Sequence, residues 1–193
     1  MGVFPVITKV SALEEFRVFV FDPGLANFRP SEEQFEALQE LLAAGAGFLY
    51  AAVEQNKIIG YVAFQQPESS SYYQGKKVIE LGAVEVAPAY RKQGIAEQLF
   101  LAIKEDPELE YFIAIATEYF WHWDVKNTKL NIWEYRKLLE KLFALGGFYP
   151  VNTDDPDILA HPANLLMVKY GKKVAPEDIA AFDQLRLKNC WMI

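Results

Sequence analysis

The sequence predicts a mixed fold of strands and helices, of the α/β or α+β class, in a single domain over residues 1–193. Segments with the apolar runs typical of strands are interleaved with segments whose apolar residues recur at helical spacing. The chain has 193 residues and is 52% hydrophobic, which is enough for one sizeable core. Strands and helices are therefore expected to alternate along the chain.

The sequence of the N-terminal part predicts one strand and two helices. Residues 3–10 form the first expected strand. Ser11 caps an expected short helix over residues 12–20. A longer helix begins at Ser31, whose spacing from Gln34 matches a capping box.

A hairpin and a central strand follow. Residues 48–54 and 57–66 are rich in Ile, Val, Tyr and Phe, and the polar pair Gln55-Asn56 joins them, so we expect a β-hairpin. A polar loop over residues 67–77 leads to residues 78–86. That nearly continuous apolar run is typical of a strand buried on both faces.

Helices and strands alternate in the rest of the chain. We expect a helix after Gly94 that stops at Asp106, a buried strand over residues 111–116, and a helix from Ile132 that ends at Gly146. The remaining expected elements are a short strand over 148–151, either a helix over 162–171 or a strand over 165–170, and a last helix that begins at Pro176.

The composition argues against several classes of protein. A net charge of −7 argues against general nucleic-acid binding. No apolar run approaches the roughly 18 residues that span a membrane, and we expect no secretory signal, so the expected location is the cytoplasm. One cysteine, Cys190, excludes an internal disulfide and fits a reducing compartment.

The strongest functional signal is the turn between the central strand and the next helix. The strand runs through Pro88 into the pattern Arg91-x-x-Gly94-x-Ala96. The first N–H groups of a helix lack partners within it, and the helix dipole places partial positive charge there. Gly94 lets a ligand approach the main chain closely. The segment favours a pyrophosphate site, although an ordinary strand–turn–helix with a surface Arg-Lys pair has the same spacing.

This pattern resembles the acetyl-CoA-binding segment of the GCN5-related N-acetyltransferases (GNAT), in which the first position is Arg or Gln and the last is Gly or Ala. The resemblance implies a mixed, mostly antiparallel central sheet flanked by helices, with a helical C-terminal extension. It also implies acetyl-CoA as co-substrate and no metal. The residues implied in acetyl-CoA binding are Val84 and Val86 through their backbone, and Arg91, Gln93, Gly94, Ile95 and Ala96 around the pyrophosphate.

Five further segments are long and unusual in composition: residues 79–86, 117–124, 131–137, 153–156 and 161–164. They resemble the AcuA-type protein acetyltransferases of acetoin-utilisation operons. This narrower resemblance covers most of the chain. It implies a cytoplasmic enzyme that acetylates a lysine of AMP-forming acetyl-CoA synthetase and thereby inactivates it, with neither a nucleic acid nor a membrane as partner.

Acetyl transfer to a lysine needs a base, because the free amine has a pKa of about 10.4. Glu80 lies on the central strand eleven residues before Arg91, the offset at which protein acetyltransferases of this superfamily place their base. The alternative is a structural carboxylate hydrogen-bonded across the sheet. Glu118, at the end of the next strand, is a second candidate base. Burial should raise the pKa of such a carboxylate.

One position departs from the family pattern. Many members carry a Tyr four residues before the Gly-Phe that follows the last core helix, and use it as a general acid. Phe143 stands at that place and cannot donate a proton. The leaving thiolate has a pKa of about 8.5, so it can depart without strong acid help. Neither Tyr119 nor Tyr135 is assigned as a substitute.

The segment Trp121-His122-Trp123-Asp124 is the candidate acceptor site. Two indoles can flank a lysine stem, and a carboxylate can attract its charge. The alternative is a hydrophobic plug under a long loop. The acidic residues around Pro156 suggest a turn rather than a metal cluster.

Two other functions remain open at this point. An acetyltransferase for a small amine would suit the acidic composition equally well. A catalytically silent acetyl-CoA sensor would explain the missing tyrosine, although Glu80 and Glu118 count against it.

Overall fold

The structure is a computed structural model that describes residues 5–189, so Cys190 and the first residues of the chain lie outside it. The chain divides into two compact units, and each is described by itself. Unit 1 comprises the chain up to Gln65 together with Leu81–Ile103, and unit 2 comprises Gln66–Glu80 together with the chain from Lys104 on. Whether they act as the single predicted domain stays a prediction.

The sheet of unit 1 contains the predicted hairpin. β1 (Val6–Val10) pairs antiparallel with β3 (Gly47–Glu54), which pairs antiparallel with β4 (Lys57–Gln65). The next strand is β5 (Val78–Val86), of which residues from 81 on belong to this unit, and the short β2 (Val20–Phe21) pairs parallel with β4. Gln55 and Asn56 both have positive φ, 49° and 71°, as a two-residue hairpin turn requires.

Two expectations for the helices of unit 1 are wrong. The expected helix over residues 12–20 is a single turn, α1 (Leu13–Phe16), because the chain then enters β2. Ser31 does not cap α2 (Ser31–Ala43): Pro30 occupies the N-cap position and Gln34 is buried. The glutamine that a capping box would have used is therefore buried.

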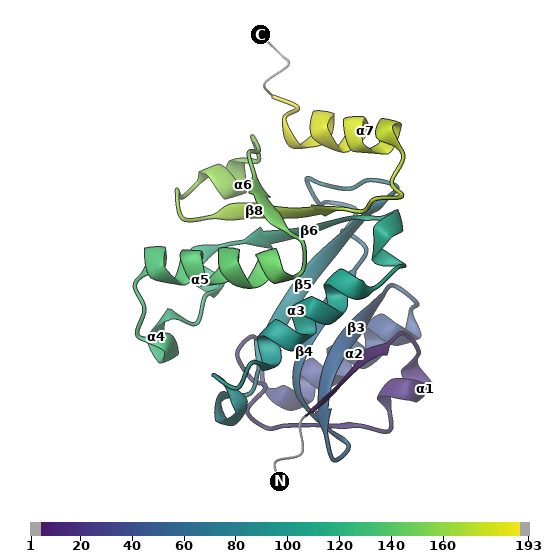
Figure 1. The fold of residues 1–193 in the computed structure, drawn as a ribbon, viewed down its shortest axis with the longest axis vertical. Coiled ribbons are helices and arrows are strands. Elements are labelled where there is room, and N and C mark those ends of the chain that lie inside the picture. Colours follow the sequence, from purple (N-terminus) through teal and green to yellow (C-terminus); the bar gives the residue numbers. More distant parts are fainter. Residues whose placement is uncertain (1–4, 190–193) are drawn as a thin grey trace. The chain divides into compact units, whose positions relative to one another are not determined.

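The last helix of unit 1 follows β5 through a short 3-10 turn, η1 (Pro88–Tyr90). This helix, α3 (Ile95–Glu105), buries one apolar side that includes Leu99 and Ile103, as its spacing predicts. Figure 1 shows it running along β4 and β5, and its first residue, Ile95, lies close to Gly60 of β4.

The sheet of unit 2 begins with the first residues of β5. They pair parallel with β6 (Ile113–Glu118), which pairs antiparallel with β8 (Leu165–Tyr170), and β8 pairs antiparallel with β7 (Tyr149–Val151). The segment left open between helix and strand is thus a strand. Its residues from 165 to 169 are all buried, which a sheet core covered on both faces can achieve and an amphipathic surface helix cannot. The mixed, mostly antiparallel sheet flanked by helices is confirmed.

The helices of unit 2 pack on opposite faces of its strands (Figure 1). On one face, Phe182 of α7 (Pro176–Arg186) joins a buried cluster with Leu166 and Val168. On the other, Lys169 lies beside Gly147, which follows α5 (Ile132–Leu145). Within residues 5–189, no helix is long and apolar enough to cross a membrane. The remaining short helices are η2 (Leu109–Tyr111), η3 (Phe120–His122), α4 (Val125–Thr128) and α6 (Pro156–Leu159).

Candidate functional site

The turn from β5 into α3 presents the main chain to solvent. The first hydrogen bond of the helix runs from the Gln98 N–H to the Gly94 carbonyl, 3.0 Å away. The N–H groups of the residues before Gln98 in α3 therefore have no acceptor within the helix. Gly94 has a φ of +76°, and a Cβ placed on it would meet nothing within 4 Å. The glycine is needed for the backbone conformation, and the space beside it is open.

Two of the side chains predicted to bind the cofactor donate hydrogen bonds to the backbone of this turn. Arg91 Nε donates to the Val86 carbonyl at 3.0 Å, and Gln93 Nε2 donates to the Ala89 carbonyl at 3.2 Å. These two hydrogen bonds hold the connection between β5 and α3 in one conformation. Ile95 is buried in the core of its unit and Ala96 is half-buried, so their backbone rather than their side chains is what a ligand could meet.

The second half of β5 is more open than its apolar sequence suggests. Gly82 is exposed, Val84 and Val86 are half-buried, and only Glu85 is buried from Gly82 to Val86. The expectation of burial on both faces is therefore wrong for this half. Apolar residues that stay partly exposed on a strand leave surface for a ligand to cover.

Glu85 has a structural role. Its carboxylate accepts the Asn27 N–H at 2.6 Å and the Tyr61 hydroxyl at 3.2 Å. Burial raises the pKa of Glu85, while these hydrogen bonds act in the opposite direction. The carboxylate thus ties the loop before α2 to the sheet of unit 1.

Glu80 lies in the part of β5 that belongs to unit 2. It is half-buried, and its Oε1 accepts the Thr117 hydroxyl of β6 at 3.1 Å. Burial raises the pKa of Glu80, which confirms the expected direction, while the Thr117 hydrogen bond lowers it. A bond across the sheet is also what the structural alternative predicts, so the geometry accommodates both roles.

Glu118 lies at the end of β6. Burial of its carboxyl raises the pKa of Glu118 to about 7, against the effect of a hydrogen bond from Trp123 Nε1 at 3.0 Å. Half of such carboxyls carry a proton near neutral pH, which is the range in which a general base works best. The structure thus joins Glu118 to one of the predicted acceptor-site residues.

The predicted acceptor site forms an aromatic segment over residues 119–124. Tyr119 stacks on Trp121 with ring centroids 4.9 Å apart, and Trp123 stacks on Tyr135 of α5 at 5.4 Å. Trp121 is 53% exposed and His122 is also exposed, so neither is a buried plug. Asp124 accepts from the side-chain amide of Asn127 at 2.7 Å.

Two polar residues that the sequence reasoning did not single out hold this region. Thr117 bonds Glu80, and the buried Asn164 accepts the Phe120 N–H at 3.0 Å while donating to the Asp157 carbonyl at 3.1 Å. Both residues lie in segments that carry the AcuA-type resemblance, and this was the one feature of the sequence that could have indicated them. A polar residue on a strand or next to one gives no indication of its partner until the fold is known.

Other candidate positions have structural explanations. Phe143 is fully buried and meets Phe148 edge to face at 5.5 Å. Asp155 caps α6 by accepting the Asp157 N–H at 2.9 Å, and Asp154 accepts the Tyr72 hydroxyl. Where a turn was expected around Pro156, the chain forms the short helix α6. Across residues 5–189, no three His, Cys, Asp or Glu side chains are grouped to hold a metal ion.

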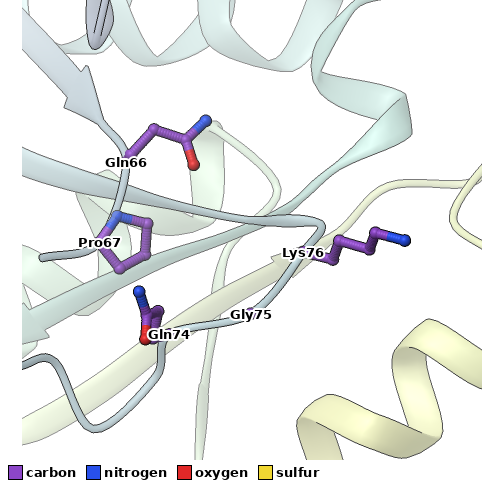
Figure 2. A pocket seen from close by; sticks show the side chains of 5 residues that line it. All are labelled: Gln66, Pro67, Gln74, Gly75 and Lys76. Carbon is purple, nitrogen blue, oxygen red and sulfur yellow. The ribbon is translucent and has the colours of Figure 1, made fainter. Parts of the chain in front are cut away.

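A separate open hollow of about 370 Å³ lies on the loop before β5, lined by Gln66, Pro67, Gln74, Gly75 and Lys76. Figure 2 shows the Gln74 amide pointing toward Pro67 and the Lys76 side chain extending away. None of the predicted site residues lines it, so it is not part of the predicted site.

The model of the acetyltransferase (GNAT) family matches residues 13–116, more than half of the chain. A GNAT-family acetyltransferase structure from Bacillus anthracis has a TM-score of 0.52 and 12% identity, covering 88% of this chain and 99% of its own, which shows a shared fold alone. The chain belongs to the acetyltransferase (GNAT) family, and the pattern at residues 91–96 lies inside the matched region.

The chain is also similar to the acetoin utilization protein AcuA. AcuA of Bacillus licheniformis is 42% identical over 182 residues, and AcuA of Bacillus subtilis is 40% identical over the same length. Each match covers 93% of this chain and 87% of the relative. The crystal structure of an acetoin utilization protein from Exiguobacterium sibiricum has 39% identity and a TM-score of 0.89, covering 99% of both chains.

Proposed function

We propose that this acetyltransferase moves the acetyl group of acetyl-CoA onto a lysine side chain of a protein, AMP-forming acetyl-CoA synthetase being the first candidate. The observation that carries the proposal is the open main chain at the start of α3. Gly94 is left-handed with empty space beside it, and the helix N–H groups there have no internal acceptor. These groups suit the pyrophosphate of coenzyme A, and membership of the family supports the assignment.

In this proposal the half-open strand from Gly82 to Val86 pairs with the pantetheine arm. The backbone N–H near Val86 is the proposed donor to the thioester oxygen as that oxygen gains negative charge. Arg91 supports this arrangement, because its hydrogen bond to the Val86 carbonyl holds the end of the strand in place.

The proposed chemistry needs one carboxylate as proton acceptor. The lysine ammonium loses a first proton to that carboxylate, the neutral amine attacks the thioester carbon, and the C–S bond breaks. The coenzyme A thiolate leaves and takes up the second proton, which the nitrogen releases as the amide forms. Glu80 and Glu118 are the two candidates, and burial raises the pKa of both. A raised pKa makes each a stronger base than an ordinary carboxylate.

The aromatic segment is the proposed site for the acceptor lysine. The exposed Trp121 can lie along a lysine stem, and Asp124 supplies negative charge three residues later in the chain. The relatives named AcuA support the AcuA-type assignment from which the protein acceptor is proposed, since each match covers 93% of this chain. A small-amine acceptor remains the second candidate, because an exposed aromatic platform with a carboxylate also suits a free amine.

A transfer assay separates these functions. The protein is incubated with labelled acetyl-CoA, purified acetyl-CoA synthetase and a panel of small amines. We expect label on the synthetase, at a lysine located by mass spectrometry. Label on an amine alone would favour the small-molecule enzyme, and binding of coenzyme A by calorimetry with no transfer would favour a sensor.

A further inference from the structure

The solvent side of α5 carries large apolar side chains. Trp133 is 52% exposed and Leu138 is 46% exposed, and the exposed Lys137 and Lys141 follow Trp133 at intervals of four residues. Residues three or four apart are neighbours on a helix, so Trp133, Lys137 and Lys141 form one stripe, and Leu138 lies at its edge, three residues before Lys141. We call Trp133, Lys137, Leu138 and Lys141 the α5 outer face.

The charge of this face is positive. The nearby Glu134 is engaged in the helix cap, where its carboxylate accepts the Asn131 N–H at 2.9 Å. Glu140 pairs with Arg136 at 2.8 Å, and Arg136 also donates to the Pro162 carbonyl. Residues 124–145 carry five Lys or Arg against three Asp or Glu, within a chain whose net charge is −7. The outer face is therefore a cationic, apolar stripe on an acidic protein.

The helix that carries this face is held rigidly. The Asn131 side chain accepts the N–H groups of Trp133 and Glu134, each at 3.0 Å, and so completes a capping box. The stacked ring of Tyr135 connects the same helix to Trp123 of the aromatic segment. A preformed apolar surface loses little side-chain freedom on binding, which favours its use in recognition.

We propose that the α5 outer face binds the acceptor protein, through an acidic surface with an apolar depression beside the acceptor lysine. This inference rests on the proposed function. One observation favours the acceptor over other occupants: the Trp123–Tyr135 stack joins α5 directly to the proposed lysine site. The exposed Lys137 and Lys141 are the reason that the proposed partner surface is acidic. Trp133 and Leu138 supply the apolar anchors typical of binding hot spots.

Two variants of the face test this. Leu138→Ser removes an anchor, and Lys137→Glu reverses a charge. We expect each to lower kcat/KM for acetyl-CoA synthetase by about tenfold, corresponding to about 1.4 kcal/mol. With a short lysine peptide that is too small to span the face, we expect kcat/KM within about twofold of the unaltered protein.

The chain offers matched controls on α3. Leu101 is 44% exposed, nearly as much as Leu138, and Lys104 is exposed like Lys137. Leu101→Ser and Lys104→Glu make the same chemical changes away from the outer face and are expected to leave kcat/KM for the synthetase unchanged. Thermal unfolding of all four variants checks that they are folded.

Each outcome decides between explanations. Unchanged synthetase acetylation in both α5 variants would overturn the docking proposal alone, as would an equal loss with the short peptide. A concentration-dependent dimer that Leu138→Ser abolishes, with transfer unaffected, would assign the face to a second copy of the chain. If the unaltered protein transfers acetyl to no protein, the proposed function fails and the docking proposal fails with it.

Discussion

At the scale of single residues, two carboxylates of unit 2 have similar environments but different partners. Glu80 is bonded by a hydroxyl and Glu118 by an indole N–H, and burial raises the pKa of both. Glu85, on the same strand as Glu80, is fully engaged by its neighbours. The carboxylates on these adjacent strands therefore divide into one structural residue and two candidates for proton transfer.

Replacement of Glu80 by Gln tests its role as base. We expect Glu80→Gln to lower kcat by roughly 10²-fold or more, because the amide cannot take a proton, while the affinity for acetyl-CoA measured by calorimetry stays the same. Thr117→Val is the companion variant. It removes a hydrogen bond that lowers the pKa of Glu80, so the rise of kcat with pH should move to higher pH. Full activity of Glu80→Gln would discard this assignment.

Glu118 makes a prediction about stability and pH. Its pKa rises from 4.5 to about 7 on folding, so the folded state binds the proton more tightly. The stability from this site is present below about pH 4.5 and is lost as the pH rises through about 7. Glu118→Gln keeps an acceptor for the Trp123 indole but does not titrate. We expect its free energy of unfolding, relative to the unaltered protein, to increase by about 2 kcal/mol between pH 5 and pH 8.

Denaturant unfolding at several pH values measures this difference directly. A difference that stays constant across the range would show that the carboxyl titrates normally in the folded protein. The same variant also serves the transfer assay, where a retained rate would leave Glu80 as the remaining candidate base.

At the scale of the elements, the β5–α3 connection combines a strained backbone with open space. Lys92 and Gly94 both have positive φ, 62° and 76°. Left-handed backbone is unfavourable for residues with a Cβ, so the chain accepts some strain at Lys92 and relies on glycine at Gly94. A strained conformation of this kind is expected where it serves a function. Here it directs main-chain N–H groups outward.

Two glycines allow strain to be separated from function. Gly94 at the start of α3 and Gly45 at the end of α2 have φ values of +76° and +61°, and a Cβ on either would meet nothing within 4 Å. We expect Gly94→Ala and Gly45→Ala each to cost about 1 kcal/mol of stability, through the backbone alone. Only Gly94→Ala should weaken coenzyme A binding in calorimetry. Equal affinities in the two variants would show that the pyrophosphate does not bind at this turn.

At the scale of the whole molecule, charge is distributed unevenly. The chain is acidic overall, yet the segment around α5 has a surplus of Lys and Arg. Attraction between exposed charges is screened over about 10 Å at 0.1 M salt and over about 3 Å at 1 M. Recognition of an acidic protein through the α5 outer face should therefore be sensitive to ionic strength.

We expect kcat/KM for the synthetase to fall several-fold as NaCl rises from about 0.05 M to about 0.5 M, mainly through slower association. The rate with a short neutral lysine peptide should change much less. Steady-state assays at matched pH measure both. If kcat/KM falls equally for the two acceptors, the effect of salt is on acetyl-CoA binding instead.

Local sequence determined much of this protein. The hairpin at Gln55-Asn56, the strand over residues 78–86, the helix after Gly94 and the final helix at Pro176 all depend on turn residues and periodicity within a few positions, and each was predictable. The family pattern at residues 91–96 is equally local. These features could be read from the chain because their causes lie within one turn or one strand.

Only the tertiary structure determined the other features of the fold and of the candidate site. It made residues 165–170 a strand, because burial on both faces depends on what packs above and below them. In the folded chain Gln34 is buried instead of capping α2, and Thr117, Trp123 and Asn164 are the hydrogen-bond partners within the candidate site. Hydrogen-bond partners, burial and pKa values arise from residues far apart in sequence, and therefore exist only once the chain is folded.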